Sequence, residues 1–240
     1  NQISKIENLD KIKNLKNLSL RCNQIKNLEN LDELFRLTYL DLWRNQIKKI
    51  ENLGKCTNLK ILELEYNQIN KIEKLDQLIN VKEINLSGNQ IGKIENLKNL
   101  TKLELLNLGS NKISKIENLD KLIKLTGLYL FNNQIRKIQN LNQLANLNFL
   151  VLSNNKIHKI ENLDQLTKLN YLDLTYNKID DLLESNLNLL SQKNIKFRIR
   201  LNDNPFIGKN GVQQEDYPKG HYANHTEQFI KDYYNLKNVI

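Results

Sequence analysis

The chain has 240 residues, and 36 Lys and Arg outnumber 27 Asp and Glu to give a formal net charge of +9 at pH 7. Hydrophobic residues make up 40% of the chain, enough to bury a core, and no run of apolar residues is long enough to indicate a membrane span. The two cysteines, Cys22 and Cys56, are too few for a disulfide framework and are not spaced as metal ligands. We therefore expect a reducing compartment, the cytoplasm or nucleus, rather than secretion.

One motif recurs along the chain. It is written NQISKIENL, NQIKKIENL, NKISKIENL and NKIHKIENL, starting at Asn1, Asn45, Asn111 and Asn155. With the leading Asn counted as position 0, apolar residues follow at positions 2, 5, 8, 11, 14, 17 and 19 of every unit. The leading residues, each 22 residues after the last, are Asn1, Asn23, Asn45, Asn67, Asn89, Asn111, Asn133, Asn155 and Asn177.

The spacing within a unit predicts one short strand followed by a compact return. In the unit that starts at Asn45, Leu62 and Leu64 are two residues apart, as in a strand with alternating faces. The other apolar residues are mostly three apart, which favours tight 3₁₀-like turns. One unit cannot bury its own apolar row, but stacked units merge their rows into a continuous core. Cys56 occupies a position that holds Leu, Ile or Val in other units, so we expect it in this core.

The leading Asn has a structural role in this interpretation. A sharp turn behind each strand leaves backbone N–H and C=O groups inside the protein. A carboxamide offers two donors and one acceptor, so stacked Asn side chains can satisfy those groups from unit to unit. The sequence therefore predicts a ladder of buried asparagines.

The pattern LxxLxLxxNxI at a 22-residue period resembles the leucine-rich repeat superfamily, and its KIENL tail resembles the short class typified by protein phosphatase 1 regulatory subunit 7. The resemblance covers about residues 1–182. Secreted bacterial internalins have a similar period, but their repeats usually carry Pro and Asp where this chain has Lys, Glu and Asn. The expected fold is an α/β leucine-rich-repeat solenoid, with parallel strands on its concave face, 3₁₀ or short helical turns on its convex face, and a C-terminal cap.

The two ends depart from the repeat. The chain starts in the middle of a unit, so we expect either a frayed first unit or a protein that continues upstream. Near the other end, "IRLNDNPF" predicts an irregular strand with Ile199 and Leu201 in the core. Phe229 and Tyr233 are four residues apart and indicate a helix near 225–235. We interpret 183–240 as a capping segment, which resembles the closing segment of many such repeat proteins and, more distantly, the cap before a GTPase domain.

Positions 16, 18 and 20 alternate with the buried strand residues and are expected to face the concave side. They carry large aromatic side chains, and in the first half of the chain they carry acids such as Glu83. Exposed aromatic groups gathered on one face are typical of a protein interface. The predicted partner contacts are Tyr39, Asp41, Trp43, Glu63, Glu65, Tyr129, Phe131, Phe149 and Tyr171.

The positive charge follows a regular arrangement. Position 4 is usually Lys, as in Lys49, and position 6 is usually Glu, as in Glu51. Stacking predicts a lysine lane beside a glutamate lane. We expect the two lanes to screen each other at the surface and to contribute little individually.

These features favour a non-catalytic protein-binding module with no cofactor. The resemblance implies a regulatory or scaffolding subunit, with a phosphatase catalytic subunit as one candidate partner. In that family acidic and aromatic strand positions contact the phosphatase; one such aromatic falls on Tyr129, whereas the acid position holds Asn107. A cytoskeletal or axonemal scaffold and the ligand-sensing region of a larger signalling protein are alternatives.

The sequence contains no Gly-rich phosphate loop, CxxC motif or nucleophile elbow, which argues against an enzyme. His221 and His225 are four apart but lie in a polar, Gly-containing stretch, so neither a metal site nor catalysis is expected. Nucleic-acid binding is also disfavoured, because the aromatic positions accompany acids rather than bases. The sequence does not indicate an oligomeric state.

Overall fold

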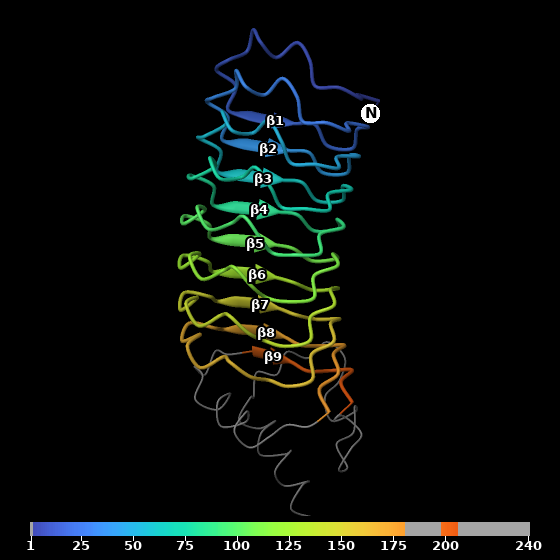
Figure 1. Ribbon diagram of the computed structural model, residues 1–240, viewed down its shortest axis with the longest axis vertical. Helices are drawn as coiled ribbons and strands as arrows, with labels where there is room; N and C mark the ends of the chain where they lie inside the picture. Colours follow the sequence, from blue (N-terminus) through green and yellow to red (C-terminus); the bar gives the residue numbers. More distant parts are fainter. Residues whose placement is uncertain (1, 181–197, 206–240) are drawn as a thin grey trace, which may run out of the picture.

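A computed structural model of the chain describes residues 2–180 and 198–205. Its strands are stacked one above another in a single parallel sheet whose spatial order follows the sequence (Figure 1). The strands are β1 (Asn17–Ser19), β2 (Tyr39–Asp41), β3 (Ile61–Glu63), β4 (Glu83–Asn85), β5 (Leu105–Asn107), β6 (Gly127–Tyr129), β7 (Phe149–Val151), β8 (Tyr171–Asp173) and β9 (Arg198–Arg200).

The register of the sheet equals the period of the sequence. Leu40 in β2 lies beside Leu62 in β3, and Leu62 lies beside Ile84 in β4, each pair 22 residues apart. Equivalent residues of successive turns therefore form straight rows. The seven apolar positions of the repeat are fully buried in the central turns, and Cys56 takes its predicted place among them. Burial raises the pKa of the Cys56 thiol to about 11.

The first turn leaves its side of the core open. Ile3 and Ile12 are each 44% exposed, whereas Ile6 is buried. The corresponding residues of the next turn are fully buried. The difference arises because each turn is covered by the neighbours on both sides of it, and the first turn of the described residues has a neighbour on one side only.

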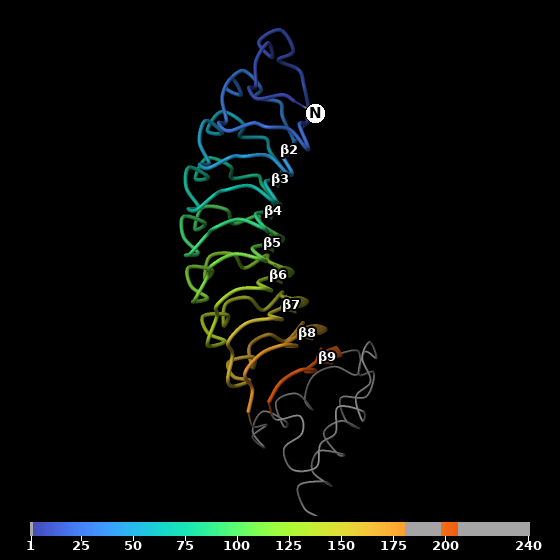
Figure 2. The same cartoon turned by 90° about the vertical axis from the view of Figure 1, so that its right-hand side faces the viewer.

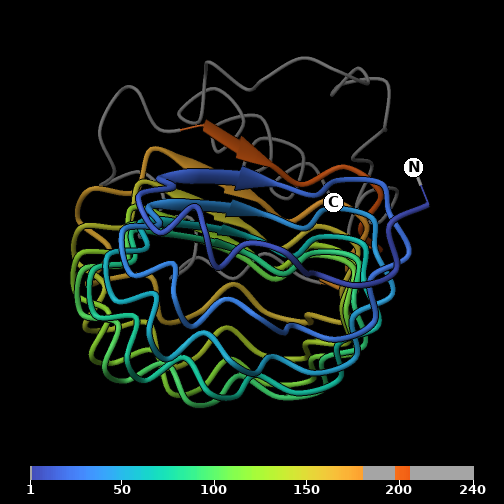
Figure 3. The same cartoon turned by 90° about the horizontal axis from the view of Figure 1, so that it is seen from above.

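The strands lie on the concave side of the solenoid, and the turns that return the chain lie opposite them (Figures 2 and 3). In the second turn Leu34 N–H donates to the carbonyl of Leu31, and Leu37 N–H donates to the carbonyl of Leu34, both at 3.0 Å. These bonds span three residues, as the spacing predicts. They form single turns, and within residues 2–180 and 198–205 none extends into a 3₁₀ or α-helix. The predicted helical convex face is therefore replaced by isolated turns.

The predicted asparagine ladder is present. The Oδ1 atom of Asn111 accepts a hydrogen bond from Ile91 N–H at 2.9 Å, one turn earlier. Its Nδ2 atom donates to the carbonyls of Leu86 and Leu108 at 2.9 and 3.1 Å. The same contacts recur at the other buried leading asparagines from Asn23 to Asn177. This ladder stabilises the stack because each side chain joins two turns through backbone groups that would otherwise be unsatisfied.

A second asparagine ladder, which the sequence reasoning missed, occupies position 7. Asn118 Nδ2 donates to the carbonyl of Ile94 at 2.7 Å, and Asn140 Nδ2 donates to that of Ile116 at 2.8 Å. These residues adopt the left-handed backbone conformation, with φ of 58° and 57°. Asn tolerates that conformation better than most residues, which explains its recurrence there. Lys74 is the exception, with φ of 55° and no such bond.

The ninth strand follows an interval longer than the repeat. β9 pairs with β8 in parallel, and Ile199 and Leu201 are 3% and 6% exposed, so the predicted irregular strand is confirmed. Asn204 continues the first ladder, accepting from Ile179 N–H at 3.1 Å. The predicted helix near 225–235 and most of the proposed cap lie outside the described residues.

Candidate protein-binding face

The predicted contact residues lie on one side of the sheet because their register positions coincide. Asn17, Tyr39, Ile61 and Glu83 form one row at position 16, and the rows at positions 18 and 20 run parallel to it. Successive residues of a strand point to opposite faces, so these rows alternate with the buried Leu and Ile residues. We call this strand side, which is concave in Figure 2, the concave face.

Asp41 lies within this face rather than on its surface. It is 3% exposed, and its Oδ1 atom accepts a hydrogen bond from Trp43 N–H at 3.0 Å. Its Oδ2 atom accepts from the hydroxyl of Tyr39 at 3.1 Å and pairs with Arg21 Nε at 3.3 Å. Burial, followed by the nearby Asp41 charge, raises the pKa of Tyr39. Asp41 therefore holds its neighbours in place, and its direct contact with a partner stays a prediction.

Several other residues at position 18 have the same local role. Asn85 Oδ1 accepts from Ser87 N–H at 3.1 Å, Asn107 Oδ1 from Gly109 N–H at 3.0 Å, and Asp173 Oδ1 from Thr175 N–H at 3.0 Å. Short side chains that bond to the N–H two residues later are a known way to shape the end of an extended segment. Asp and Asn at this position are thus explained by the fold.

Trp43 is surrounded by groups from its own and neighbouring turns. The guanidinium carbon atoms of Arg21 and Arg44 lie 4.7 and 5.0 Å from its ring centroid. The ring of Tyr66 meets it edge-on, with centroids 6.3 Å apart. Cation–π and edge-to-face contacts of this kind hold an aromatic side chain in one orientation. Trp43 therefore presents a preordered, partly covered surface to solvent.

The acidic part of the concave face comes from Glu63, Glu65 and Glu83. Asn85 Nδ2 donates to Glu65 Oε2 at 3.1 Å, which positions that carboxylate. Burial raises the pKa of Glu63, and the negative charges of Asp41, Glu65 and Glu83 raise it further. The charged form of Glu63 is thus disfavoured where it stands, and a nearby cation would relieve that cost.

A hollow of about 270 Å³ lies on the concave face across β3 to β6. Its polar lining includes the side chains of Glu63 and Glu83, and Asn107 lies among them. Leu105 and the ring of Tyr129 supply apolar surface beside the carboxylates. The arrangement suits a group with a positive end and an apolar stem, such as Lys or Arg, because carboxylates bind the charge while the apolar groups cover the stem.

Two aromatic residues of the face rest against glycines of the sheet. A Cβ atom added at Gly109 would lie 2.3 Å from the ring of Phe131. One added at Gly127 would lie 3.1 Å from the ring of Tyr129. The missing side chains therefore make room for the rings, which explains why Phe131 and Tyr129 are half-buried although they project from the concave side.

The last aromatic pair lies on neighbouring strands. Phe149 starts β7 and Tyr171 starts β8, and their ring centroids are 6.2 Å apart. Phe149 is 45% exposed, which is high for a residue in the centre of a sheet. The structure thus brings the predicted contact residues together on one face but divides them into an acidic part, an aromatic part and the Trp43 cluster.

Sequence reasoning missed several residues that shape this face. Arg21 and Tyr66 contact Trp43, and Leu105 lines the hollow. Leu105 stands at position 16 and could have been chosen from the same pattern as its neighbours. Tyr66 lies one residue beyond the alternating positions, at a left-handed turn with φ of 52° that no periodic pattern announces.

No group of His, Cys, Asp and Glu within the described ranges could hold a metal ion. His158 is exposed, and the other two histidines fall outside those ranges. Across residues 2–180 and 198–205, no helical segment has the length and apolar character needed to cross a bilayer.

Solved structures with the same architecture come from bacteria and plants. An internalin (inlF) of Listeria monocytogenes has a TM-score of 0.74 at 26% identity, over 85% of this chain and 66% of that one. Internalin C2 of the same species has a TM-score of 0.69 at 33% identity, over 72% and 77%. The ectodomain of the Arabidopsis thaliana receptor kinase GASSHO1/SCHENGEN3, solved with CASPARIAN STRIP INTEGRITY FACTOR 2, has a TM-score of 0.62 at 26% identity, over 74% and 26%.

This chain thus spans less than two thirds of the first and third of these relatives. No curated protein sequence matches it. The family model for leucine-rich repeats (two copies) matches residues 36–80, 79–121, 123–165 and 145–189, which together are more than half of the chain. With the 22-residue register and the parallel sheet, these matches establish that the chain belongs to the leucine-rich repeat family.

Proposed function

We propose that this leucine-rich-repeat protein binds a partner protein on its concave face, and that a Lys or Arg side chain of the partner enters the hollow between Glu63, Glu83 and Tyr129. The observation that carries the proposal is the raised pKa of Glu63 in a hollow that also offers apolar walls. A carboxylate held at such a cost gains most from an incoming cation. The aromatic part of the face, with Phe149 exposed, supplies apolar contact area beside it.

The sheet gives this face enough length for a specific interface. Nine strands at about 4.8 Å spacing extend over about 40 Å, which accommodates a standard interface of roughly 800 Å² on each partner. No catalytic group is needed for this role, and we propose a non-catalytic regulatory or scaffolding subunit. The compartment we propose is the cytoplasm or nucleus, supported by the two free cysteines, of which Cys56 is buried.

A phosphatase catalytic subunit is one partner that we propose to test. The support for it is the KIENL repeat and the aromatic at Tyr129, while Asn107 stands where the related family carries an acid. Asn107 also forms the local bond to Gly109 N–H, so its side chain is already used by the fold.

The test compares binding with stability. In the Glu63→Gln, Glu83→Gln double variant, partners that depend on the hollow should be lost while the protein becomes no less stable, because repulsion between carboxylates is removed. The matched control is Glu73→Gln, Glu95→Gln, which removes the same charge from the glutamate lane. Binding would be measured by selecting from a displayed random peptide library and by affinity capture with mass spectrometry.

We expect the wild-type protein and the control to enrich peptides with Lys or Arg beside apolar residues, and the Glu63 and Glu83 variant to lose them. Tyr129→Ala should weaken the same peptides. Equal retention by all variants would place the binding site elsewhere on the protein and overturn the proposal. Selection of acidic peptides would do the same.

A further inference from the structure

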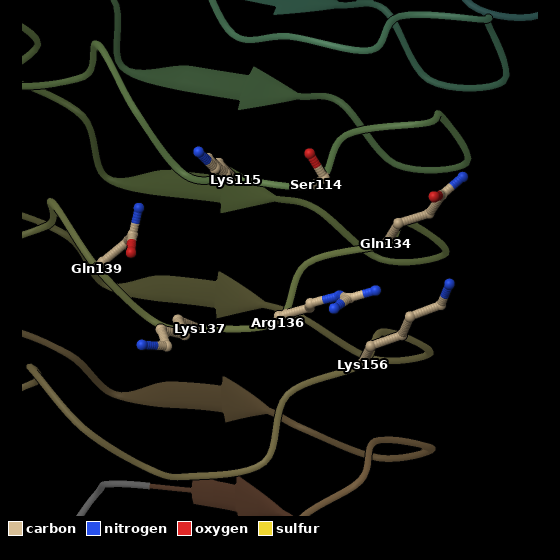
Figure 4. A pocket seen from close by; sticks show the side chains of 7 residues that line it. All are labelled: Ser114, Lys115, Gln134, Arg136, Lys137, Gln139 and Lys156. Carbon is tan, nitrogen blue, oxygen red and sulfur yellow. The ribbon is translucent and has the colours of Figure 1, made fainter.

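A second hollow lies away from the concave face, on the segments that follow strands β5, β6 and β7. Its volume is about 540 Å³. Figure 4 shows its side chains coming from three consecutive turns, with Ser114 and Lys115 on one, Arg136 and Lys137 on the next and Lys156 on the third. The amides of Gln134 and Gln139 complete the polar lining. Every charged side chain that lines this hollow is positive.

The excess of positive charge has a specific cause in the sequence. Position 6 is Glu in the turns on either side, at Glu117 and Glu161, and in all earlier turns. At this turn it is Gln139, whose amide donates to the carbonyl of Ile116 at 3.4 Å. Position 3 of the same turn is Arg136, where the preceding turn has Ser114. The glutamate lane is therefore interrupted where the cations are densest.

The cations of the hollow are not neutralised within the described structure. Lys115, Arg136, Lys137 and Lys156 are exposed, and none of them forms an ion pair within residues 2–180 and 198–205. The ion pairs that do occur there lie elsewhere, for example between Lys82 and Glu104. Four like charges gathered around one hollow repel each other, so an anion that enters it would lower the electrostatic energy of the site.

We infer that this hollow binds a compact anion with clustered phosphate groups. Arginine and lysine together suit phosphate oxygens, since guanidinium donates two parallel hydrogen bonds and ammonium supplies a point charge. The carboxylates of Glu117 and Glu161 limit the uncompensated region to about one turn, so a compact ligand fits better than an extended chain. No aromatic residue lines the hollow, whereas single-stranded nucleic acid usually stacks on such groups.

Inorganic tripolyphosphate is the probe for this site, and isothermal titration calorimetry on the 240-residue chain is the assay. We expect Arg136→Gln, Lys137→Gln to weaken binding by about tenfold, because two charge-assisted contacts are lost. Gln139→Glu restores the lane carboxylate and should weaken binding several-fold without removing any cation. The carbonyl of Ile116 keeps its hydrogen bond from Asn140 in that variant, so the fold is preserved.

The matched control is Lys48→Gln, Lys49→Gln. These lysines occupy positions 3 and 4 of an earlier turn, the same positions as Arg136 and Lys137, but Glu51 stands beside them. The control should bind tripolyphosphate as wild type does. Its melting temperature and those of the test variants should match wild type, since all the substituted side chains except that of half-buried Gln139 are exposed.

Four outcomes would overturn the inference. They are equal weakening by the control pair, no effect of Gln139→Glu, binding of citrate as tight as that of tripolyphosphate, and preferential binding of a single-stranded RNA oligonucleotide through the same residues. The last would identify a nucleic-acid surface. Binding that depends on Arg136, Lys137 and the neutrality of Gln139 alone supports the phosphate site, and it is independent of the outcome at the concave face.

Discussion

Replacing Lys74 by Asn should stabilise the protein. Lys74 occupies the left-handed conformation that Asn takes in the other turns, and the carbonyl of Ile50 accepts no hydrogen bond from any described residue. Asn at this position would donate to that carbonyl, as Asn96 does to Ile72 at 2.7 Å. The hydrogen bond contributes about 1 kcal/mol, and relief of the left-handed strain adds about 0.5–1 kcal/mol. We expect the free energy of unfolding to rise by about 1.5–2 kcal/mol.

Urea unfolding followed by circular dichroism measures this difference, and the midpoint should rise by roughly 0.5 M or more. Lys74→Gly separates the two contributions, because glycine relieves the backbone strain without donating to Ile50, and its extra freedom in the unfolded chain offsets that relief. The reverse change, Asn118→Lys, should destabilise by an amount similar to the gain at Lys74. A midpoint that is unchanged in Lys74→Asn, or equal in the Asn and Gly variants, would refute the ladder argument.

Three further changes test other contacts. Asn111→Ala should lower the free energy of unfolding by about 3 kcal/mol or more, measured by urea unfolding, because it leaves several buried backbone groups unpaired; an unchanged midpoint would contradict this. The pKa of Glu63 is raised on folding, so the folded state binds more protons and stability falls as pH rises through that window. Glu63→Gln should remove this part of the decline, which unfolding midpoints between about pH 4 and pH 7 would detect. Gly109→Ala should cost about 1 kcal/mol in wild type but little in a Phe131→Ala background, as a double-mutant cycle would show.

The sequence carried enough information to predict the core and the first asparagine ladder. Leu62 and Ile84 are buried because a period of 22 residues places them side by side in the sheet, and periodic apolar positions can face each other in only one way. The leading Asn could be assigned a structural role because its chemistry matches the backbone groups that a sharp turn leaves inside. Repetition made both inferences robust, since every turn repeats the same test.

The candidate site was less accessible, because it depends on contacts between the variable positions. Asp41 and Glu63 occupy the same row and look alike in sequence, yet Asp41 is short enough to bond to Trp43 N–H, whereas Glu63 forms no equivalent bond in the described residues. The seating of Phe131 on Gly109 required the relative placement of two turns. The predicted helical convex face failed because three-residue spacing is equally satisfied by separate turns.

Departures from the repeat are the most informative residues in this protein, and they have different causes. Gly109 departs from the larger side chains of its row and gains a seated aromatic ring. Glu63 replaces the short residues that would complete a local hydrogen bond, and it carries a raised pKa as a consequence. Gln139 removes a carboxylate beside four cations. A residue that lowers stability in its own turn and gains nothing within the fold is the one whose explanation lies in a ligand, and Glu63 fits that description.

At Lys74 the same criterion gives a different result. It also lowers the stability of its turn, but no hollow or charge cluster of the described residues includes it, and nothing in the structure explains the substitution. The contrast separates strain that coincides with a binding surface from strain that does not. Stability gained at Lys74 should therefore leave binding at both proposed sites unchanged, whereas stability gained at Glu63 should come with a loss of partner affinity.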